Sequence, residues 1–206
     1  MTAITYQEMD GFEYKPVAVG LLHPVEDADL IKDLEKISHR TGVPTNMIVN
    51  SILPNNGATR DEDRRWLKNF DPNNPPTGTY MVKAKNDATH TKALARMQWM
   101  AGVLIRNYIE ARVVSIFDII EDMEGAHRLD QVDVVFIYNL EVGLVGKEMT
   151  GWQLAKVLDF LARRLNQYAT FVYVESLENL GKFGPSLREF VEGYYVPLKP
   201  TPNQSQ

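Results

Sequence analysis

The sequence predicts an α/β protein built on a mostly parallel sheet with helices on both faces. Apolar, β-branched runs typical of buried strands alternate along the chain with segments whose apolar residues recur at helical spacing. Strands linked by helical crossovers pair in parallel, and such sheets are covered on both faces. The clearest strand is the continuous apolar run from Val132 to Ile137, and the clearest helix, from Thr89 to Tyr108, follows a strand at Thr79 to Lys83.

A small helical region is expected ahead of the sheet. Residues 1–24 predict an irregular arm or one edge strand, because glycine and proline interrupt their short apolar run. From Asp27 the apolar spacing predicts a helix that ends at Thr41-Gly42-Val43-Pro44, and a shorter helix follows from Thr45 to Ile52. Two short helices of this kind are typical either of plain packing or of a helix-turn-helix that reads DNA.

Helices and strands then alternate through the rest of the chain. Helices are predicted at residues 60–70, 89–108, 117–123, 152–167 and 187–191. Strands are predicted at residues 79–83, 111–116, 132–137, 170–174 and 194–198, and Thr150 stands where it would cap the helix at 152–167. These elements predict an arm with a small helical region at 1–60, an α/β domain at 61–199 and a disordered tail at 200–206.

Composition limits the classes of function. The 206 residues, 44% of them hydrophobic and 24% charged, are typical of an ordinary globular protein. The chain contains no cysteine, which excludes disulfides and thiolate metal sites, and its four scattered histidines form no metal motif. The net charge of −5 does not favour strong autonomous DNA binding. No apolar run approaches the roughly 20 residues that span a bilayer and no signal-peptide pattern is present, so we expect a cytoplasmic protein without membrane contact.

Two basic clusters interrupt this acidic composition. One contains Arg60, Arg64, Arg65 and Lys68, and the other contains Arg163 and Arg164. Each cluster is typical either of a solvated helix face or of a local contact with nucleic-acid phosphates. The first cluster, together with the helices at 30–52, is the basis of a DNA-binding hypothesis.

Two strand ends have the shape of a phosphate-binding site. The strand at 79–83 enters a polar turn, Ala84 to Ala88, and leaves it as a helix, which is the context in which backbone N–H groups cradle phosphates. The strand at 132–137 ends at Tyr138, where a phosphate-binding ATPase places its magnesium-binding and catalytic acids. Because ligands of parallel sheets bind at the carboxyl ends of the strands, we expect the site at these ends and at Glu175.

The order and spacing of these pieces resemble the DnaC/IstB-type AAA+ ATPases, which load replicative helicases or assist transposases. The resemblance covers Asp61 to Lys199. It includes Trp66-Leu-Lys-Asn-Phe-Asp-Pro before the first strand and Phe171-Val-Tyr-Val-Glu at the family's first sensor. The closing segment Phe183-Gly-Pro-Ser-Leu-Arg-Glu-Phe is similar to the family's helix that carries an inter-subunit arginine, here Arg188. The resemblance implies a P-loop NTPase fold of the AAA+ type with a nucleotide site between subunits.

The residues at the family's nucleotide-binding motifs have changed. A working phosphate loop needs glycines, a lysine for the phosphate charge and a hydroxyl for magnesium. Here Ala84 and Thr89 replace the glycines and His90 replaces the lysine. The candidate nucleotide-binding positions lie in the phosphate-loop region, at the end of the strand at 132–137 and at the sensor. They are Lys85, Thr89, His90, Thr91, Tyr138, Asn139, Glu141 and Glu175.

The resemblance and these changes predict a pseudo-ATPase that kept the fold and lost hydrolysis, with no catalytic residue, metal or cofactor. Such a protein would assemble with a replicative helicase, another AAA+ protein or copies of itself, in DNA replication or in phage or mobile-element DNA transactions. Residues 26–60 would bind the partner, and DNA would be contacted through the complex. Two alternatives stay open. One is an active DnaC-like ATPase that binds ATP and magnesium through Lys85 or Lys92 and Glu141, and the other is a DNA-binding accessory protein.

Other candidate sites have plainer interpretations. Gly143 to Thr150 contains a Gly-Lys pair and a hydroxyl, but its spacing is short for a phosphate loop. His90 is typical of a turn residue, because no second histidine or acid at helical spacing supports a role as ligand or base. An exposed helix face, rather than a metal site, is expected for Asp118, Glu121, Asp122 and Glu124. Core and interface positions are expected for Trp152, Tyr168 and Tyr173.

Overall fold

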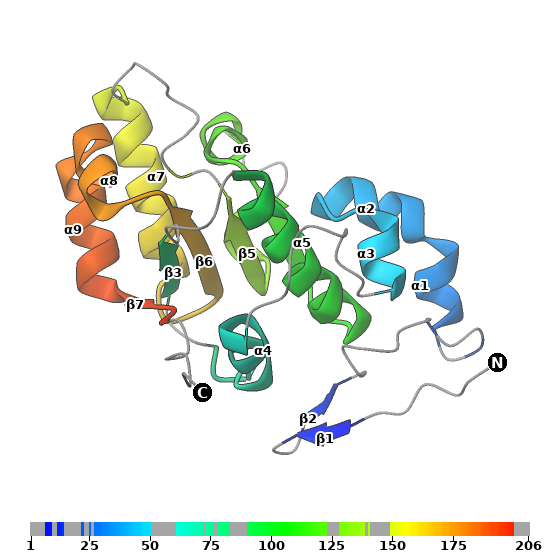
Figure 1. The fold of residues 1–206 in the computed structure, drawn as a ribbon. Helices are drawn as coiled ribbons and strands as arrows, with labels where there is room; N and C mark the ends of the chain where they lie inside the picture. The colour runs from blue at the N-terminus through cyan, green and yellow to red at the C-terminus, as the bar shows by residue number, and fades with distance from the viewer. Residues whose placement is uncertain are drawn as a thin grey trace.

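The centre of the computed structural model is a five-stranded sheet in which every strand is parallel to its neighbours, in the order β4-β5-β6-β3-β7. The strands are β3 (Gly78–Val82), β4 (Ala111–Val114), β5 (Val134–Ile137), β6 (Ala169–Val174) and β7 (Tyr195–Pro197). The structure describes residues 7–9, 12–14, 22, 25, 27–50, 61–71, 73–75, 78–82, 90–122, 128–138, 140 and 149–199. Helices lie on both sides of the sheet (Figure 1), so the predicted α/β fold class is confirmed.

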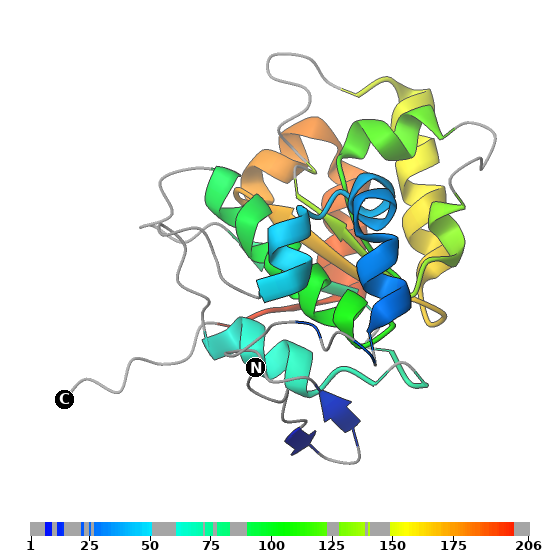
Figure 2. The ribbon, with the colours of Figure 1, turned by 90° about the vertical axis from the view of Figure 1, so that its right-hand side faces the viewer.

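Two groups of helices cover the two faces of the sheet. The first group is α1 (Ala28–Lys32), α2 (Leu34–Thr41), α3 (Thr45–Asn50), α4 (Asp61–Lys68) and α5 (His90–Arg106). The second is α6 (Ile116–Glu121), the 3₁₀ helix η1 (Leu129–Gln131), α7 (Gly151–Arg164), α8 (Leu177–Phe183) and α9 (Pro185–Tyr194). Figure 2 shows α1 to α3 lying outside α5. Among the described helices, none has both the length and the apolar character that crossing a membrane requires.

The central strands are apolar along their whole length because both faces are covered. Every residue of β5 and β6 is buried. Along β6, Phe171 and Tyr173 belong to the core under α5, whereas Val172 and Val174 belong to the core under α7 to α9. Side chains alternate between faces at every residue of a strand. The continuous apolar runs in the sequence are therefore the expected pattern for a sheet with two cores.

Trp66 anchors α4 to this sheet. The centre of its indole lies 5.5 Å from that of the Phe171 ring and 5.9 Å from that of Phe136, edge-on in both cases. Its Nε1–H donates a hydrogen bond of 2.9 Å to the Thr79 hydroxyl on β3. A buried tryptophan needs such an acceptor for its N–H. Trp66 therefore fills the apolar face of the sheet and also fixes the position of α4 along β3.

A buried ion pair joins α4 to α5. Arg96 donates from Nε and Nη2 to the two carboxylate oxygens of Asp63, at 2.8 and 2.6 Å, and its Nη2 lies 3.4 Å from a carboxylate oxygen of Glu62. All three side chains are buried. Moving charges out of water is costly, and the bidentate geometry is what offsets that cost. The pair therefore constrains the packing of the two helices closely.

Arg164, at the end of α7, is buried, so the prediction of a solvated face is wrong for this residue. Its guanidinium donates to the Thr170 hydroxyl at 2.9 Å, to Leu129 O at 2.7 Å and to Ala169 O at 2.6 Å. Burial lowers the pKa of Arg164 to about 10, although nearby acidic groups oppose the shift. The three bonds tie α7 to η1 and to the start of β6. Its neighbour Arg163 is exposed, as predicted.

Two glycines let the helical region approach the sheet and α5. α2 ends at Gly42, whose φ is 69°, and a Cβ at Gly42 would lie 2.4 Å from the Val113 carbonyl oxygen on β4. A Cβ at Gly102 of α5 would lie 2.5 Å from the Met47 carbonyl oxygen on α3. Only glycine permits these approaches. The predicted helix end at Gly42 is confirmed, but the single helix expected before it is two helices, separated at Asp33.

The N-terminal part differs from expectation in two further ways. Among the described strands, β1 (Gln7–Met9) and β2 (Phe12–Tyr14) pair antiparallel with each other and not with the main sheet, so no edge strand of that sheet is found here, and the rest of the expected arm lies outside the described residues. α3 buries Met47 and Ile48 in the core that it shares with α5, as in the packing interpretation of this helix pair. Residues 51–60 and 200–206 lie outside the described part, so the boundary at residue 60 and the disordered tail stay predictions.

The C-terminal elements end the sheet at β7. α8, which the sequence did not predict, begins at Ser176, whose hydroxyl accepts a 3.0 Å hydrogen bond from the Asn179 N–H. Among the strands that the structure describes, β7 pairs with β3 alone, and Leu198 N–H donates to Tyr80 O at 2.8 Å. Alternate N–H groups of a strand point to opposite sides, so position 197 faces the open edge, and Pro197 has no N–H to expose there.

Asp63→Ala is predicted to destabilise the fold strongly, because it leaves the Arg96 guanidinium buried without its bidentate partner. Breaking a buried ion pair from one side costs about 3–5 kcal/mol. The measurement is the free energy of unfolding in urea. The matched control is Asp61→Ala, which removes an exposed acid from the same turn of α4 and should cost less than about 1 kcal/mol. Equal losses in the two variants would contradict the role given to the ion pair.

Candidate functional site

The strand order places a topological switch point between β3 and β6, at the carboxyl ends of the strands. The chain leaves β3 through α5 on one face of the sheet and leaves β6 through α8 and α9 on the other face. Figure 1 shows β3 and β6 side by side between these helices. Open α/β sheets bind ligands where neighbouring strands send their connections to opposite faces. The fold therefore favours a ligand outside the ends of β3 and β6.

Two of the sequence-predicted residues follow strands at this edge. Val174 of β6 pairs with Val82 of β3, and Glu175 comes directly after it. β5 is the neighbour of β6 on the other side, and Tyr138 follows its last residue. Both side chains are half-buried. The sheet thus brings Tyr138 and Glu175 together at the carboxyl ends of its strands, although they stand far apart in the sequence.

The side chain of Tyr138 carries no charge at neutral pH. Burial raises the pKa of Tyr138 above the ordinary tyrosine value, the negative charge of Asp118 raises it further, and a hydrogen bond with Ser115 acts in the opposite direction. Ser115 and Asp118 belong to a capping box at the start of α6. Ser115 N–H donates to Asp118 Oδ2 at 2.6 Å, and Asp118 N–H donates to Ser115 Oγ at 3.2 Å. A neutral phenol therefore stands where the family resemblance expects an acid.

The remaining predicted nucleotide-binding positions lie outside the described part of the chain. The main chain of His90 and Thr91 is the first turn of α5, but their side chains and that of Lys92 are not described. Also outside are Lys85, Thr89, Asn139, Glu141 and the alternative phosphate segment at 143–148. Their roles stay predictions.

Arg188 lies on the outer surface formed by α8 and α9. Its Nε donates to Glu192 Oε2 at 3.0 Å, one turn further along α9, and this bond and the charge of Glu192 raise the pKa of Arg188. Its Cδ lies 3.1 Å from the point where a Cβ on Gly181 of α8 would stand. The guanidinium is thus held on the surface by residues of its own two helices.

The acidic helix face is exposed, as the sequence predicts, at two of its four residues. Asp118 and Glu121 are exposed on α6, Asp122 is half-buried, and Glu124 lies outside the described residues. Among the residues that the structure describes, no group of three or more His, Asp or Glu side chains is arranged to hold a metal ion.

The magnesium and ATP that the resemblance implies do not fit Tyr138. Magnesium in phosphate-transferring sites is held by carboxylates and hydroxyls together with phosphate oxygens. The protonated phenol of Tyr138 is a weak ligand, and the Ser115 hydroxyl beside it is buried and already caps α6. The Tyr138 phenol and the Ser115 hydroxyl are therefore neutral hydrogen-bonding groups rather than magnesium ligands.

Sequence reasoning missed the partners of Tyr138. Ser115 and Asp118 were assigned to a strand and to an exposed helix face, although Ser-x-x-Asp directly after a strand is a recognisable start of a helix. The pattern predicts the capping box, but only the pairing of β4 with β5 brings it next to Tyr138. The sequence alone contains no indication of that contact.

No protein-family model matches the chain, and no curated protein matches it in sequence. The structure defines its class as an α/β protein with an all-parallel sheet that fits a P-loop-like fold.

The Tyr138 hydroxyl is predicted to ionise above the ordinary tyrosine value of about pH 10. Because its folded-state pKa is raised, Tyr138 contributes stability that is fully present below about pH 10 and is lost as the pH rises through the folded-state pKa. The measurement is tyrosine ionisation by ultraviolet absorbance, with Tyr138→Phe subtracted from wild type and Tyr194→Phe as the reference for an exposed tyrosine. A Tyr138 difference curve centred below that of the reference would contradict this assignment.

Proposed function

We propose that this chain is a non-catalytic protein with an AAA+-like fold that acts by protein–protein assembly in DNA replication or in mobile-element DNA transactions, resembling a helicase loader. The parallel sheet, the switch point between β3 and β6 and the order of helices and strands support the comparison with the DnaC/IstB type. Replicative helicases, other AAA+ proteins and copies of this chain are the proposed partners.

The observation that carries the non-catalytic part is the neutral Tyr138 at the end of β5. Loss of a group that stabilises charge in the transition state typically lowers the rate by orders of magnitude. A phenol held in its protonated form supplies neither a magnesium ligand of the usual kind nor a base for the attacking water. Loss of hydrolysis is the simplest consequence of this substitution.

Exposed apolar side chains support the assembly part of the proposal. Trp152 on α7 is 54% exposed, with the Lys156 ammonium 5.3 Å from the centre of its ring, so it does not lie in the core, and the interface position that was also expected stays a prediction. Tyr194, at the end of α9, is 57% exposed, and Val196 of β7 is 63% exposed. Tryptophan and tyrosine are enriched among the residues that dominate binding energy at interfaces. The α7 to β7 side of the molecule is therefore the proposed assembly face.

Wild-type protein is predicted to show no thermal stabilisation by ATP or ADP with magnesium. A nucleotide at a hundred times its dissociation constant would add about 2.7 kcal/mol of stability, which a thermal-shift measurement detects easily. The control is Thr91→Ala, which removes the last hydroxyl of the phosphate-loop pattern and should behave as wild type. A shift in wild type that disappears in Thr91→Ala would favour the ATPase alternative instead.

The assembly part has a separate test. Purified protein should change its mass in sedimentation velocity, either by itself or on addition of the replicative helicase of the same source. Trp152→Ser should weaken the complex and leave the melting temperature of the free chain unchanged, because the indole is exposed. A chain that stays monomeric and binds neither the helicase nor another AAA+ protein would contradict the proposal.

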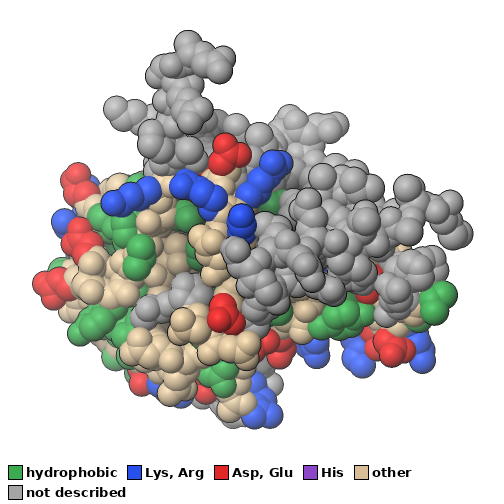
Figure 3. Space-filling view, turned by 90° about the horizontal axis from the view of Figure 1, so that it is seen from below, with side chains coloured by type: hydrophobic (Ala, Val, Ile, Leu, Met, Phe, Trp, Pro, Cys, Tyr) green, Lys and Arg blue, Asp and Glu red, His purple; other side chains and the backbone are tan. Residues whose placement is uncertain are grey.

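A second candidate, DNA binding, is favoured by the charge of α4. The acids Glu62 and Asp63 point inward to Arg96, whereas Arg64, Arg65 and Lys68 are exposed, as the sequence predicted for a solvated face. Lys199, also exposed, lies nearby, since its carbonyl oxygen is 3.4 Å from Arg65 Nη2. Figure 3 shows a row of Lys and Arg side chains on the side of the molecule where α4 lies. The helix therefore presents positive charge although the chain is acidic.

If this face contacts phosphates, double-stranded DNA is expected to bind with an affinity that falls steeply with salt. Arg64→Glu with Arg65→Glu should weaken binding at every DNA sequence and flatten the plot of log affinity against log salt by about one unit per lost phosphate contact. The matched control reverses two exposed charges elsewhere, Arg163→Glu with Lys182→Glu. Equal effects of the two double variants would mean that only net charge matters and would remove the α4 face from consideration.

A further inference from the structure

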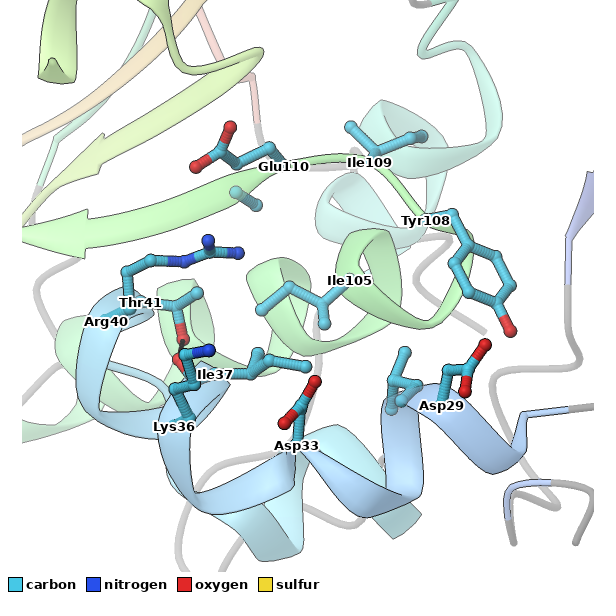
Figure 4. Close-up of a pocket in the computed structure, with 12 residues that line it drawn as sticks. Asp29, Asp33, Lys36, Ile37, Arg40, Thr41, Ile105, Tyr108, Ile109 and Glu110 are labelled. Atoms are coloured by element: carbon cyan, nitrogen blue, oxygen red, sulfur yellow. Dashed lines mark hydrogen bonds between the residues drawn. The ribbon is translucent and has the colours of Figure 1, made fainter.

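A cavity of about 350 Å³ lies between α1–α2 and the corner at which α5 turns into β4. Its walls come from four elements that are adjacent in space, as the close-up in Figure 4 shows. The cavity is at the start of β4, whereas the switch point between β3 and β6 lies at the carboxyl ends of the strands. It is therefore a separate site, at the amino end of β4. Its volume is within the range of small ligand pockets.

The floor of the cavity is apolar. Leu30 of α1, Ile105 near the end of α5, and Ile109 and Ala111 at the start of β4 are buried, and Ile37 of α2 is half-buried beside them. Figure 4 shows Ile37 and Ile105 in the middle of the pocket. An apolar surface of this kind gains stability when an apolar side chain covers it. The floor therefore selects an occupant with an apolar centre.

Four of the five charged side chains of the wall are arranged by sign. The fifth, Glu110, lies on the side of Arg40 and pairs with Arg112 at 2.8 Å. Lys36 and Arg40, one turn apart on α2, stand at one end, and Asp29 stands at the other, with Asp33 between Asp29 and Lys36, as Figure 4 shows. All four side chains are exposed, and none forms an ion pair with another side chain in the part of the chain that the structure describes. The cavity thus offers a positive end and a negative end on either side of an apolar centre.

Tyr108 closes the acidic end of the cavity. Its φ of 60° ends α5, and its hydroxyl donates a hydrogen bond of 2.9 Å to Asp27 at the start of α1. The ring is 65% exposed, so it forms a wall at the surface. A left-handed tyrosine is unusual and is held here by its surroundings. The hydrogen bond therefore attaches this wall to the start of α1.

We infer that this cavity binds a peptide segment of a partner protein, with an apolar anchor residue in the centre, an acidic residue next to Lys36 and Arg40, and a basic residue next to Asp29 and Asp33. Charge complementarity at both ends sets the direction of the peptide, and burial of the anchor supplies most of the affinity. The inference rests on the proposed function only in that the peptide would belong to an assembly partner.

The test uses defined pentapeptides with blocked ends and ¹³C-methyl spectra of isoleucine. Three peptides share a central leucine: one has glutamate first and lysine last, one has the reverse order, and one has glutamine at both ends. Free leucine is the fourth probe. The reporters are the methyl groups of Ile37, Ile105 and Ile109, and those of Ile119 and Ile137, in the core on the other face, are the internal control. One charged peptide should shift the reporters in a saturable way and should bind more tightly than the other three probes.

Charge variants decide whether the ends of the cavity act as proposed. Lys36→Glu with Arg40→Glu should weaken the preferred peptide by about tenfold or more, and a peptide with lysine at both ends should regain binding. The matched control is Lys32→Glu, an exposed lysine of α1 that does not line the cavity, which should leave binding unchanged. The substituted side chains are exposed, so the variants should fold, and the methyl spectra verify this.

Three results would overturn the inference. They are reporter methyls that no peptide shifts, an affinity that the double charge variant leaves unchanged, and free leucine binding as tightly as the preferred peptide. The last result would mean that the cavity binds a small molecule. The proposed function has its own measurements, nucleotide stabilisation and complex formation with a helicase or AAA+ protein. Its failure would therefore be distinguishable from failure of the peptide site.

Discussion

The buried ion pair between Arg96 and Asp63 is the interaction on which the arrangement around β3 depends. α4 precedes this strand and α5 follows it, so a link between the two helices constrains the chain on both sides of β3. The Trp66 indole, bonded to Thr79, adds a second attachment in the same place. A buried ion pair permits few other arrangements, because any that separates the charges leaves one of them unpaired away from water. The same pair turns the acids of α4 inward and leaves its basic residues outside.

Much of the fold was predictable because the patterns that specify it are local. The apolar runs of β5 and β6 and the stripe of α5 each lie within one short window of sequence, and Thr150 with Gln153 forms the capping box that starts α7. α8 escaped prediction because Gly181 lies inside its seven residues, and glycine in a helix interior weakens the helical pattern. The strand order and the burial of Arg164 were out of reach for a different reason. They depend on groups that meet only in the folded chain, such as the carbonyl oxygen of Leu129.

In the candidate sites, too, some features follow from local sequence patterns and others arise only in the folded chain. Strand ends can be read from sequence, which is why Tyr138 and Glu175 were expected at the carboxyl edge and are found there. The hydrogen bond of Tyr138 with Ser115 and the effect of the Asp118 charge on Tyr138 required the pairing of β4 with β5, which no local pattern specifies. The cavity beside α2 was not anticipated either. In the sequence Lys36 and Arg40 have the spacing of a solvated helix face, and only the approach of Tyr108 and Ile109 makes that face one wall of a pocket.

The two outer strands of the sheet that the structure describes, β4 and β7, each lack a free row of backbone groups with which another chain could pair. At one edge, Pro197 replaces an outward-facing N–H of β7. At the other, the carbonyl oxygens of β4 that bond to β5 alternate with ones that face outward, and Gly42 at the end of α2 lies against the outward-facing carbonyl of Val113. Unprotected edge strands are templates for pairing with other chains. Growth of the sheet by strand addition is therefore hindered at both ends, so crowded copies of this protein are protected from edge-to-edge aggregation.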